Sequence, residues 1–570
     1  MTPRIAIDLR TGRLHDAYSS FRNWTLDLDV ERCTFRLLRP MQLNPLHLLS
    51  RLVALLACFL PATVLCETKS VPNDRHVVVL VWDGMRPDFV TEANTPALWK
   101  LAHDGVTFRR HHSVYPTATN VNGAAIATGV YPNRSSLLAN HEYRPQINPR
   151  SAFENSEPEV IKKGDEVTGG KYLASPTIAE ILHAAGRRTA VVGTKAVAFL
   201  HDRHGEWTTA TTKKAFTIFA AAPMPPSLRD QMQQTLGSFL TEPSNSGAQR
   251  NEFVTRALTE VLWRDELPAF SLLWLSEPDL TQHEDSPGAE TSVAAIRGSD
   301  RNLALVLDAL TKKKARDTTD ILIVSDHGFS TIERGIDFVT ALRAAGFDAV
   351  SRFEEAPKPG QIMFVGNGGT ILFYVIEHDR AVTARLVEWL QHSDFAGVIF
   401  AREKFEGAFP LEAVHADTPD APDVVVALHW TAKPNRFGVP GTIITDSARG
   451  TNEGSHATLS EFDVHNTLIA AGPDFRRGLM SDVPSGNVDL APTVLHLLGL
   501  DGPNKFDGRV LVEALNETAS PDKKTTTKTS EVSRTFPTGE WRQHLRISRV
   551  GENAYIDEGN GAFETSNAKP

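Results

Sequence analysis

The chain has 570 residues, of which 41% are hydrophobic and 22% are charged, and its formal net charge is −10. These proportions are typical of a folded protein and exclude a low-complexity chain, while the length calls for a large domain with a sizeable insertion. The negative charge argues against a nucleic acid as a stable partner, because a phosphate backbone binds basic surfaces.

The amino-terminal region carries a targeting signal. The apolar run from Leu52 to Leu65 has about the length of a signal-peptide core and follows Arg51. We therefore predict a signal peptide over residues 41–66 and a periplasmic or secreted protein. A retained membrane anchor is the alternative, although the run is short for a stable membrane span. Residues 1–40 are interpreted as a non-native upstream extension. All three cysteines precede residue 67, which excludes disulfides and cysteine zinc sites from the rest of the chain.

From Val77 onward, short apolar runs alternate with amphipathic stretches. This order predicts an α/β sandwich, in which a mostly parallel central sheet is covered by helices on both faces. The predicted strands are Val77–Trp82, Arg188–Val192, Phe270–Leu275, Ile321–Val324 and Thr467–Ala470. The predicted helices are Pro96–Asp104, Ser175–Ala185, Arg250–Arg264, Ala294–Leu310 and Leu490–Leu498. They form a catalytic core in two parts, residues 75–330 and 454–515.

Three further segments follow from composition and pattern. Residues 331–453 combine a helix over Ile336–Ala345 with several strands and many Pro and Gly, which predicts an inserted α+β lid domain. Residues 516–540 are rich in Thr, Ser, Lys and Asp and are predicted to be a flexible linker. Residues 541–570 contain two strand-like pieces and are predicted to form a terminal β-hairpin.

Polar residues that bind metals follow several of the predicted strands. They are Asp83, Asp279 with His283, Asp326 with His327, and His456 in a Gly-Ser-His run. Each alone has an ordinary interpretation, as a turn, a solvated pair on a helix or a surface histidine. Ligands of an open parallel sheet collect at the carboxyl ends of its strands, and Asp with His suits zinc or a similar ion. Together these residues therefore predict a metal-dependent hydrolase.

Thr119 lies just before a helix-like stretch over residues 122–128. The amino end of such a helix attracts phosphate, so Thr119 is a candidate nucleophile. A threonine hydroxyl is weakly nucleophilic, and no His, Lys or Cys adjoins it in sequence, so a metal would have to activate it. The ordinary role of a threonine here is to cap the helix, and Thr117 fits that role about as well.

Several segments together resemble the type I phosphodiesterase/nucleotide pyrophosphatase family of the alkaline phosphatase superfamily, in its bacterial secreted form. The matching segments are Pro116–Thr119, Ala127–Pro132, Glu277–Asp279 with His283, Val324–Gly328, Gly454–His456 and Asn487–Leu500. The likeness runs from about Val77 to Leu500 and implies an alkaline-phosphatase-like sandwich. It also implies hydrolysis of a small phosphate diester or pyrophosphate through a covalent phospho-threonine.

The resemblance assigns roles by position. It makes Thr119, rather than Thr117, the attacking residue and Asn140 the residue that contacts the phosphoryl oxygens. It implies two zinc ions, one held by Asp83, Thr119, Asp326 and His327 and the other by Asp279, His283 and His456. The histidines His111, His112, His141 and His465 match no metal motif and are predicted to be structural.

Two positions depart from the family pattern. Ala118 and Asn120 stand where nucleotide-cleaving members have Lys and an aromatic residue, so the substrate need not be a nucleotide. An alkaline phosphomonoesterase or a phosphonoacetate hydrolase on the same site stays an alternative, as does an inactive binding module. Sulfatase activity is disfavoured, because the residues after Thr119 lack the motif that sulfatases require. The sequence indicates no oligomeric state.

Overall fold

The computed structural model describes residues 25–29, 34–38, 75–203, 217–218, 226–240, 246–500, 505–516 and 524–566. The chain divides into two compact units, Met1–Ser70 and Val71–Pro570. In the first unit β1 (Thr25–Asp29) pairs antiparallel with β2 (Thr34–Leu38). The predicted signal peptide, residues 41–66, lies outside the described residues. Among the helices of the described ranges, none is long and apolar enough to span a bilayer.

The second unit is built on a central sheet of eight strands in the order β23-β4-β22-β11-β3-β10-β8-β9. Neighbouring strands run parallel except on the two sides of β22, which is antiparallel to β11 and β4. This confirms the predicted mostly parallel α/β sheet. The strands are β3 (His76–Trp82), β4 (Val106–Phe108), β8 (Thr189–Gly193), β9 (Thr217–Ile218), β10 (Phe270–Leu275), β11 (Thr319–Val324), β22 (Leu468–Ala471) and β23 (Leu479–Ser481).

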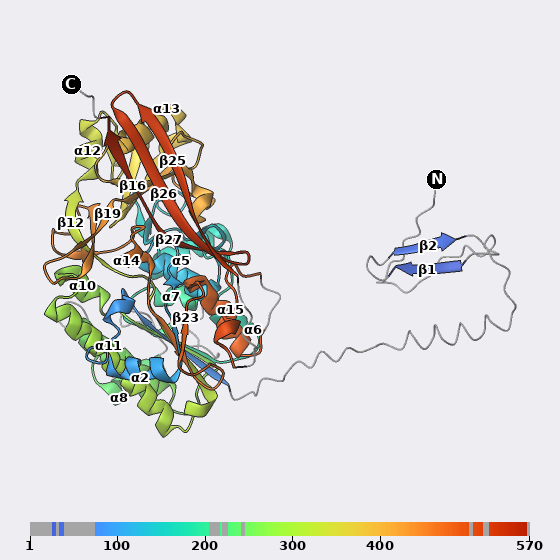
Figure 1. Cartoon of the computed structure of the whole chain (residues 1–570). Helices are drawn as coiled ribbons and strands as arrows, with labels where there is room; N and C mark the ends of the chain where they lie inside the picture. The colour runs from blue at the N-terminus through green and yellow to red at the C-terminus, as the bar shows by residue number, and fades with distance from the viewer. Residues whose placement is uncertain are drawn as a thin grey trace. The chain divides into compact units, whose positions relative to one another are not determined.

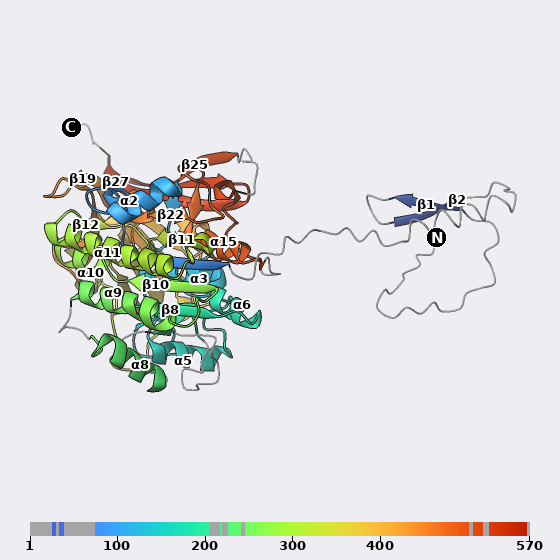
Figure 2. The same cartoon turned by 90° about the horizontal axis from the view of Figure 1, so that it is seen from below.

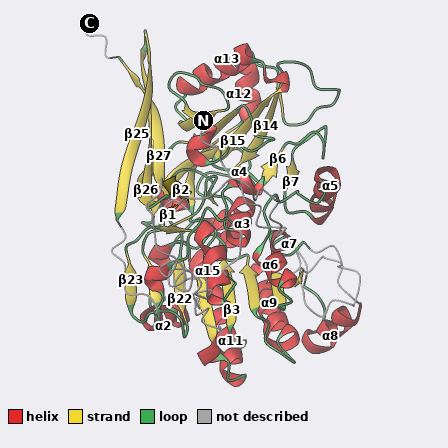
Figure 3. Cartoon of the chain, turned by 90° about the vertical axis from the view of Figure 1, so that its right-hand side faces the viewer, coloured by secondary structure: helices red, strands yellow, loops and turns green. Residues whose placement is uncertain are grey.

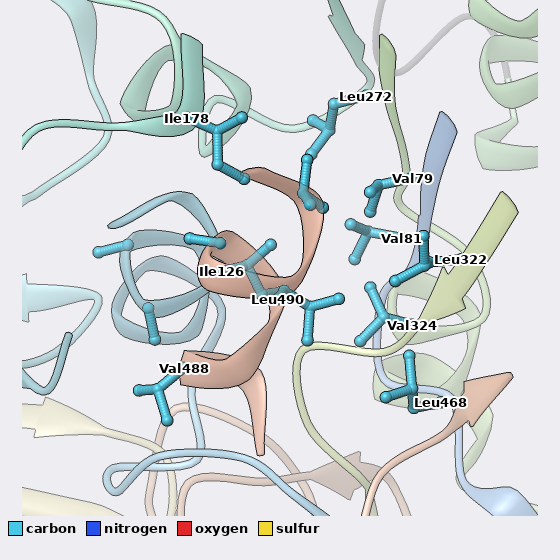
Figure 4. Close-up of a cluster of buried hydrophobic side chains, with 14 of the residues drawn as sticks. Val79, Val81, Ile126, Ile178, Leu272, Leu322, Val324, Leu468, Val488 and Leu490 are labelled. Atoms are coloured by element: carbon cyan, nitrogen blue, oxygen red, sulfur yellow. The ribbon is translucent and has the colours of Figure 1, made fainter. Parts of the chain in front are cut away.

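Helices cover both faces of this sheet (Figure 2). Successive residues of a strand point to opposite faces, so Val79 and Val81 join one apolar cluster while Val78 and Leu80 join another. Figure 4 shows the first cluster, where Val81 and Leu322 from the sheet meet Leu490. Its helices are α3 (Thr119–Thr128), α5 (Pro158–Thr168), α6 (Ile178–Ala184), α7 (Ala198–His201) and α15 (Leu490–Leu497). The opposite face carries α2 (Pro96–Asp104), α8 (Pro226–Leu236), α9 (Gly247–Arg256) and α11 (Glu290–Lys312).

The predicted core elements agree with the observed ones to within a few residues at each end. The largest difference lies in the predicted helix Arg250–Arg264, which the structure divides into α9 and a π-helical segment, Ala257–Leu262. Both pieces bury apolar side chains on the same face of the sheet. The amphipathic period therefore predicts the position of this helix but not its change of pitch.

Residues 331–453 hold a second sheet, in the order β13-β14-β15-β18-β16-β17. The helices α12 (Phe338–Ala344) and α13 (Arg380–Gln391) pack on it (Figure 3). The α+β character of the segment is as predicted, and its role as a lid stays a prediction. The strands are β13 (Ala349–Val350), β14 (Ile362–Asn367), β15 (Thr370–Val375), β16 (Ala396–Ala401), β17 (Phe409–Pro410) and β18 (Val424–Leu428).

A third sheet joins this segment to the core, in the order β19-β20-β12-β21. Within it β12 pairs antiparallel with β21, so the two ends of the inserted segment are hydrogen-bonded to each other. The strands are β12 (Ser330–Ile336), β19 (Trp430–Pro434), β20 (Pro440–Asp446) and β21 (Gly454–Ser455). The shorter helices of the second unit include α4 (Pro132–Ser135), α10 (Asp279–Asp285) and α14 (Glu461–Val464).

The carboxyl-terminal region differs from the prediction. The structure forms β25 (Thr525–Phe536) within the predicted linker, residues 516–540. This strand extends the predicted hairpin of β26 (Gly539–Val550) and β27 (Asn553–Thr565) into a three-stranded antiparallel sheet (Figure 1). The linker interpretation was wrong because β25 is a largely exposed edge strand, whose composition is polar while threonine itself favours strands.

Trp541 and Gln543 of β26 attach this sheet to the rest of the unit. The Trp541 ring is fully buried, and its Nε1–H donates to the carbonyl of Gly407 at 3.0 Å. The Gln543 side chain accepts from the Ile399 N–H at 2.7 Å and donates to the Ile399 carbonyl at 3.0 Å. The side-chain amide of Gln543 thus completes the hydrogen bonds of β16.

We predict that Trp541→Ala lowers the free energy of unfolding by about 3–5 kcal/mol, because it leaves a cavity and an unpaired carbonyl. Denaturant unfolding of the purified variant measures this change. Trp99→Ala is the control, since 36% of Trp99 is exposed and its loss should change stability by less than about 0.5 kcal/mol. Equal stability of the two variants would show that the terminal sheet is not part of the folded unit.

Candidate metal centre

Three neighbouring strands deliver the predicted carboxylates to one edge of the sheet. Asp83 follows β3, Asp279 lies four residues beyond β10, and Asp326 follows β11. Since β3 lies between β10 and β11, the three strand ends are adjacent. The backbone ties them further, because the Asp83 N–H donates to the Leu275 carbonyl and the Asp279 N–H to the Asp83 carbonyl. The site therefore lies where the parallel-sheet rule predicts.

The side chains form two groups that could each hold an ion, Asp83 with Asp326 and His327, and Asp279 with His283 and His456. In the first group His327 Nε2 lies 3.2 Å from Asp326 Oδ2 and 3.6 Å from Asp83 Oδ1. In the second, Asp279 Oδ1 lies 3.4 Å from His283 Nε2 and 3.6 Å from His456 Nε2.

The two groups adjoin each other. His327 Nε2 is 4.0 Å from Asp279 Oδ1, and the rings of His327 and His456 stack with centroids 3.7 Å apart. Burial, together with the neighbouring His327, holds the pKa of His456 well below its usual value, so this imidazole is neutral and keeps a lone pair.

Each histidine is oriented by a backbone carbonyl. The Nδ1 atoms of His283, His327 and His456 lie 2.9, 2.8 and 2.8 Å from the carbonyl oxygens of Gly454, Gly328 and Thr117. A carbonyl only accepts, so each Nδ1 carries the proton and each Nε2 presents its lone pair. This arrangement is the usual outer support of histidines that bind metals.

The carboxylates show the complementary feature. Asp83 Oδ1, Asp279 Oδ1 and Asp326 Oδ2 are fully buried and have no hydrogen-bond partner among the residues that the structure describes. Buried oxygens without hydrogen-bond partners are rare, and here all three lie within 4.0 Å of one nitrogen, His327 Nε2. The residues therefore fit divalent ions of the zinc type, which accept both oxygen and nitrogen donors.

The hydroxyls of Thr119 and Thr117 have different surroundings in the structure. Thr119 is the first residue of α3, after the capping position that Ala118 occupies, and its Oγ1 lies 3.3 Å from His327 Nε2. Thr117 is fully buried, and its hydroxyl donates to the Thr458 carbonyl at 2.9 Å. Thr119 is thus placed beside the first group of ligands, whereas Thr117 has a structural hydrogen bond.

Asn140 lies at the amino end of α3, next to Thr119. Its Oδ1 accepts from the Asn120 N–H at 2.7 Å, which leaves its amide NH₂ group as a donor. The Asn120 side chain donates to Glu154, whose second oxygen lies 3.0 Å from His141 Nε2. Glu154 was not predicted, because no motif in the sequence marks it.

Lys195 is a second residue that sequence reasoning missed. Its Nζ lies 2.6 Å from Asp279 Oδ2 and 3.0 Å from Asp83 Oδ2. Burial raises the pKa of Asp279, but the Lys195 ammonium and His283 outweigh it and hold that pKa well below its usual value. A signal was present, because Lys195 follows the predicted strand Arg188–Val192 and so lies at the same edge of the sheet as the carboxylates.

A third cluster contains His112, His465 and Asp557. Here Asp557 accepts from His112 Nε2 at 3.1 Å, from the Ser548 hydroxyl at 2.7 Å and from Arg110 at 3.3 Å. Its oxygens are therefore satisfied by the protein, unlike those of the first two groups. These contacts support the prediction that His112 is structural, and the role of His465 stays a prediction.

The comparison with known families agrees with this geometry. The sequence profile described as type I phosphodiesterase/nucleotide pyrophosphatase matches residues 77–436. Human ectonucleotide pyrophosphatase/phosphodiesterase 5 shares the fold, with a TM-score of 0.55 and 17% identity over 78% of this chain and 100% of that one. The murine protein, solved as an inactive threonine-to-alanine variant with AMP, has a TM-score of 0.54 and 16% identity, with the same coverage.

Curated relatives show the same pattern at low identity. The bis(5'-adenosyl)-triphosphatase enpp4 of Xenopus laevis is 21% identical over 80% of this chain and 84% of its own length. Venom phosphodiesterase 2 of Crotalus adamanteus is 25% identical over 45% of this chain. The chain spans about a quarter of the length of the venom phosphodiesterases that it matches, 27% for this one.

We predict that zinc raises the stability of metal-free protein, by about 2.7 kcal/mol at roughly 100 times its dissociation constant. The cause is that the ion pairs buried oxygens that otherwise have no partner. Thermal unfolding with and without zinc measures the shift. Asp326→Asn should lose most of it, while Asp482→Asn, at an exposed ion pair with Arg109, should keep it. An unchanged melting temperature of the wild-type protein with zinc would contradict the assignment.

Proposed function

Because the chain belongs to the type I phosphodiesterase/nucleotide pyrophosphatase family and is therefore a phosphoric ester hydrolase, we propose that it cleaves phosphate diesters or pyrophosphates through a phospho-threonine on Thr119. We further propose that two zinc ions bind, one at each group of ligands. The observation that carries this proposal is that the two groups adjoin each other beside the Thr119 hydroxyl, which lies 3.3 Å from His327 Nε2, and that three of their buried carboxylate oxygens have no partner among the described residues.

The first group lies beside the attacking oxygen, which is 3.3 Å from His327 Nε2. Asp83, Asp326 and His327 would hold one ion next to Thr119, and Asp279, His283 and His456 would hold the other. When bound, such ions supply positive charge that favours the Thr119 alkoxide and stabilises the departing oxygen. The Thr119 oxygen bonds to phosphorus as the leaving oxygen departs, and water then breaks the new bond and restores the hydroxyl.

Asn140 and α3 position the phosphoryl group. The side-chain oxygen of Asn140 already accepts a hydrogen bond from the Asn120 N–H. The NH₂ group of Asn140 is therefore the part of this side chain that can donate to a phosphoryl oxygen. The positive end of the helix macrodipole of α3 faces the same place, since Thr119 is its first residue. Stabilising charge on these oxygens is the chief task of a protein in phosphoryl transfer.

The surroundings of Thr119 favour a monoanionic diester over a dianionic monoester. The Lys195 ammonium is already paired with Asp83 and Asp279. The Glu154 carboxylate, held one hydrogen bond from Asn120, adds negative charge that repels a second charge on the substrate. In support, one relative is named as a bis(5'-adenosyl)-triphosphatase.

We also propose that the protein acts in the periplasm or outside the cell. The support is the signal-like segment at residues 41–66 and the names of relatives, which include venom enzymes and ectonucleotide phosphodiesterases. If the substrate comparison below shows no preference for the diester, the result would favour a phosphomonoesterase on the same site.

We predict that Thr119→Ala lowers kcat for an aryl phosphodiester by roughly a thousand-fold or more, because it removes the attacking atom. Bound metal, measured by elemental analysis, should stay at the wild-type level. Thr117→Val is the matched control. It removes only the hydrogen bond to Thr458, so it should cost about 1–3 kcal/mol of stability and leave kcat within a few fold. Full activity of Thr119→Ala would defeat the nucleophile assignment.

We predict that kcat/KM for bis(4-nitrophenyl) phosphate exceeds that for 4-nitrophenyl phosphate by at least about tenfold, a difference of about 1.4 kcal/mol. Both substrates release the same chromophore, so one spectrophotometric assay measures them. Glu154→Gln should lower the ratio of the two kcat/KM values. It removes the repelling charge and so should raise kcat/KM for the monoester. A preference of the wild-type enzyme for the monoester would overturn the diester assignment.

A further inference from the structure

We propose that Lys195 is a positioning residue that orients Asp83 and Asp279 and so links the two ion sites, an inference that rests on the proposed two-ion centre. Lys195 touches one carboxylate from each group, 3.0 Å from Asp83 Oδ2 and 2.6 Å from Asp279 Oδ2. Asp83 belongs to the first group and Asp279 to the second. The ammonium is therefore a shared contact between the two halves of the centre.

The two oxygens of each carboxylate have different partners. Oδ2 of Asp83 receives Lys195 and the Trp274 Nε1–H at 2.8 Å, and Oδ2 of Asp279 receives Lys195. Oδ1 of each has no hydrogen-bond partner within the described ranges and faces His327 Nε2, at 3.6 and 4.0 Å. By binding both Oδ2 atoms, Lys195 leaves both Oδ1 atoms directed at the ion positions.

The backbone holds Lys195 in place. It lies between β8 and α7, directly after Thr194, whose hydroxyl donates to Asn251 Oδ1 at 2.8 Å and whose N–H donates to the Trp274 carbonyl at 3.1 Å. A Cβ at Gly193 would lie 2.8 Å from the Cβ of Ala198, so the chain turns tightly there. The Lys195 side chain is only 20% exposed, and its ammonium has little freedom to leave the carboxylates.

The positive charge of Lys195 also affects the stability of the metal-free protein. Three buried carboxylates meet at this edge of the sheet, and like charges in a buried site repel each other strongly. In metal-free protein the Lys195 ammonium compensates part of that charge. Removing it should therefore lower the stability of the metal-free protein.

The test compares Lys195→Met, which removes the charge, with Lys195→Arg, which keeps it. Zinc affinity is measured by competition with a chromophoric chelator, and thermal unfolding is followed with and without zinc. We expect Lys195→Met to lower zinc affinity 10–100-fold, the usual effect of losing an outer partner of a metal ligand. The zinc-induced rise in melting temperature should be smaller than that of the wild type, because weaker binding stabilises the folded protein less, and Lys195→Arg should recover part of the affinity. Lys171→Met, at an exposed lysine, should match the wild type.

Zinc affinity of Lys195→Met equal to or tighter than that of the wild type would overturn the proposal, since it would reduce Lys195 to a charge that competes with the ions. Lys195→Gln, which keeps donors without the charge, gives the same comparison if Lys195→Met does not fold without metal. These readouts need no substrate. A wild-type protein that binds zinc but hydrolyses neither aryl phosphate defeats the proposed function, while the affinities still decide the role of Lys195.

Discussion

The structure depends on placing three carboxylates, Asp83, Asp279 and Asp326, in one fully buried position. Desolvation disfavours each charge, and the charges also repel one another, so the arrangement is unstable unless cations share it. The protein provides one cation, Lys195, and leaves one oxygen of each carboxylate without a hydrogen-bond partner among the described residues. The fold around the site supplies the rigidity that keeps this unfavourable arrangement from relaxing.

Two glycines show how tightly the strand ends must approach. Gly84 adopts a φ of +70°, and a Cβ there would lie 2.9 Å from the Phe329 ring, while its N–H donates to Asp326 Oδ1. At Gly328 a Cβ would lie 2.0 Å from the Phe462 carbonyl oxygen. Asp83 and Gly84 form the kind of Asp-Gly turn that is common after any strand. Here the turn is also a requirement of the site, because only glycine lets the neighbouring loops come this close to the carboxylates.

The sequence predicts that these carboxylates lie at one edge of the sheet because the determinants of that placement are local. Asp83 directly follows a strand with a strong apolar run, and Asp326 lies two residues beyond the end of another, so the alternation of strands and helices alone places them at one edge. Glu154 and the carbonyl partners of His283 and His456 depend on contacts between segments far apart in the chain, which no local pattern records. The strand β25 was missed for a different reason, since an edge strand buries little and its composition resembles that of a linker.

The positions that depart from the family pattern show how reaction and substrate are divided in this fold. The Asn120 N–H donates to the Asn140 side chain, and the Asn120 side chain donates to Glu154. The inserted segment supports these residues from outside, because its turn between β14 and β15 makes two hydrogen bonds to residues beside the site. Asn367 accepts from the His141 N–H at 2.8 Å, and the Gly369 N–H donates to the His456 carbonyl at 2.9 Å.

The inserted segment therefore contacts His456 and the residue after Asn140, and among the described residues it contributes no member of either candidate ligand group. The sheet fixes the position of the carboxylates, on which the proposed phosphoryl transfer depends. The surroundings of the carboxylates come from loops and from this segment. Loops vary without disturbing the core, so the same buried carboxylates serve different esters when only the surrounding residues change. That division explains why motifs at strand ends reveal the reaction, whereas Ala118 and Asn120 reveal only which substrate contacts are absent.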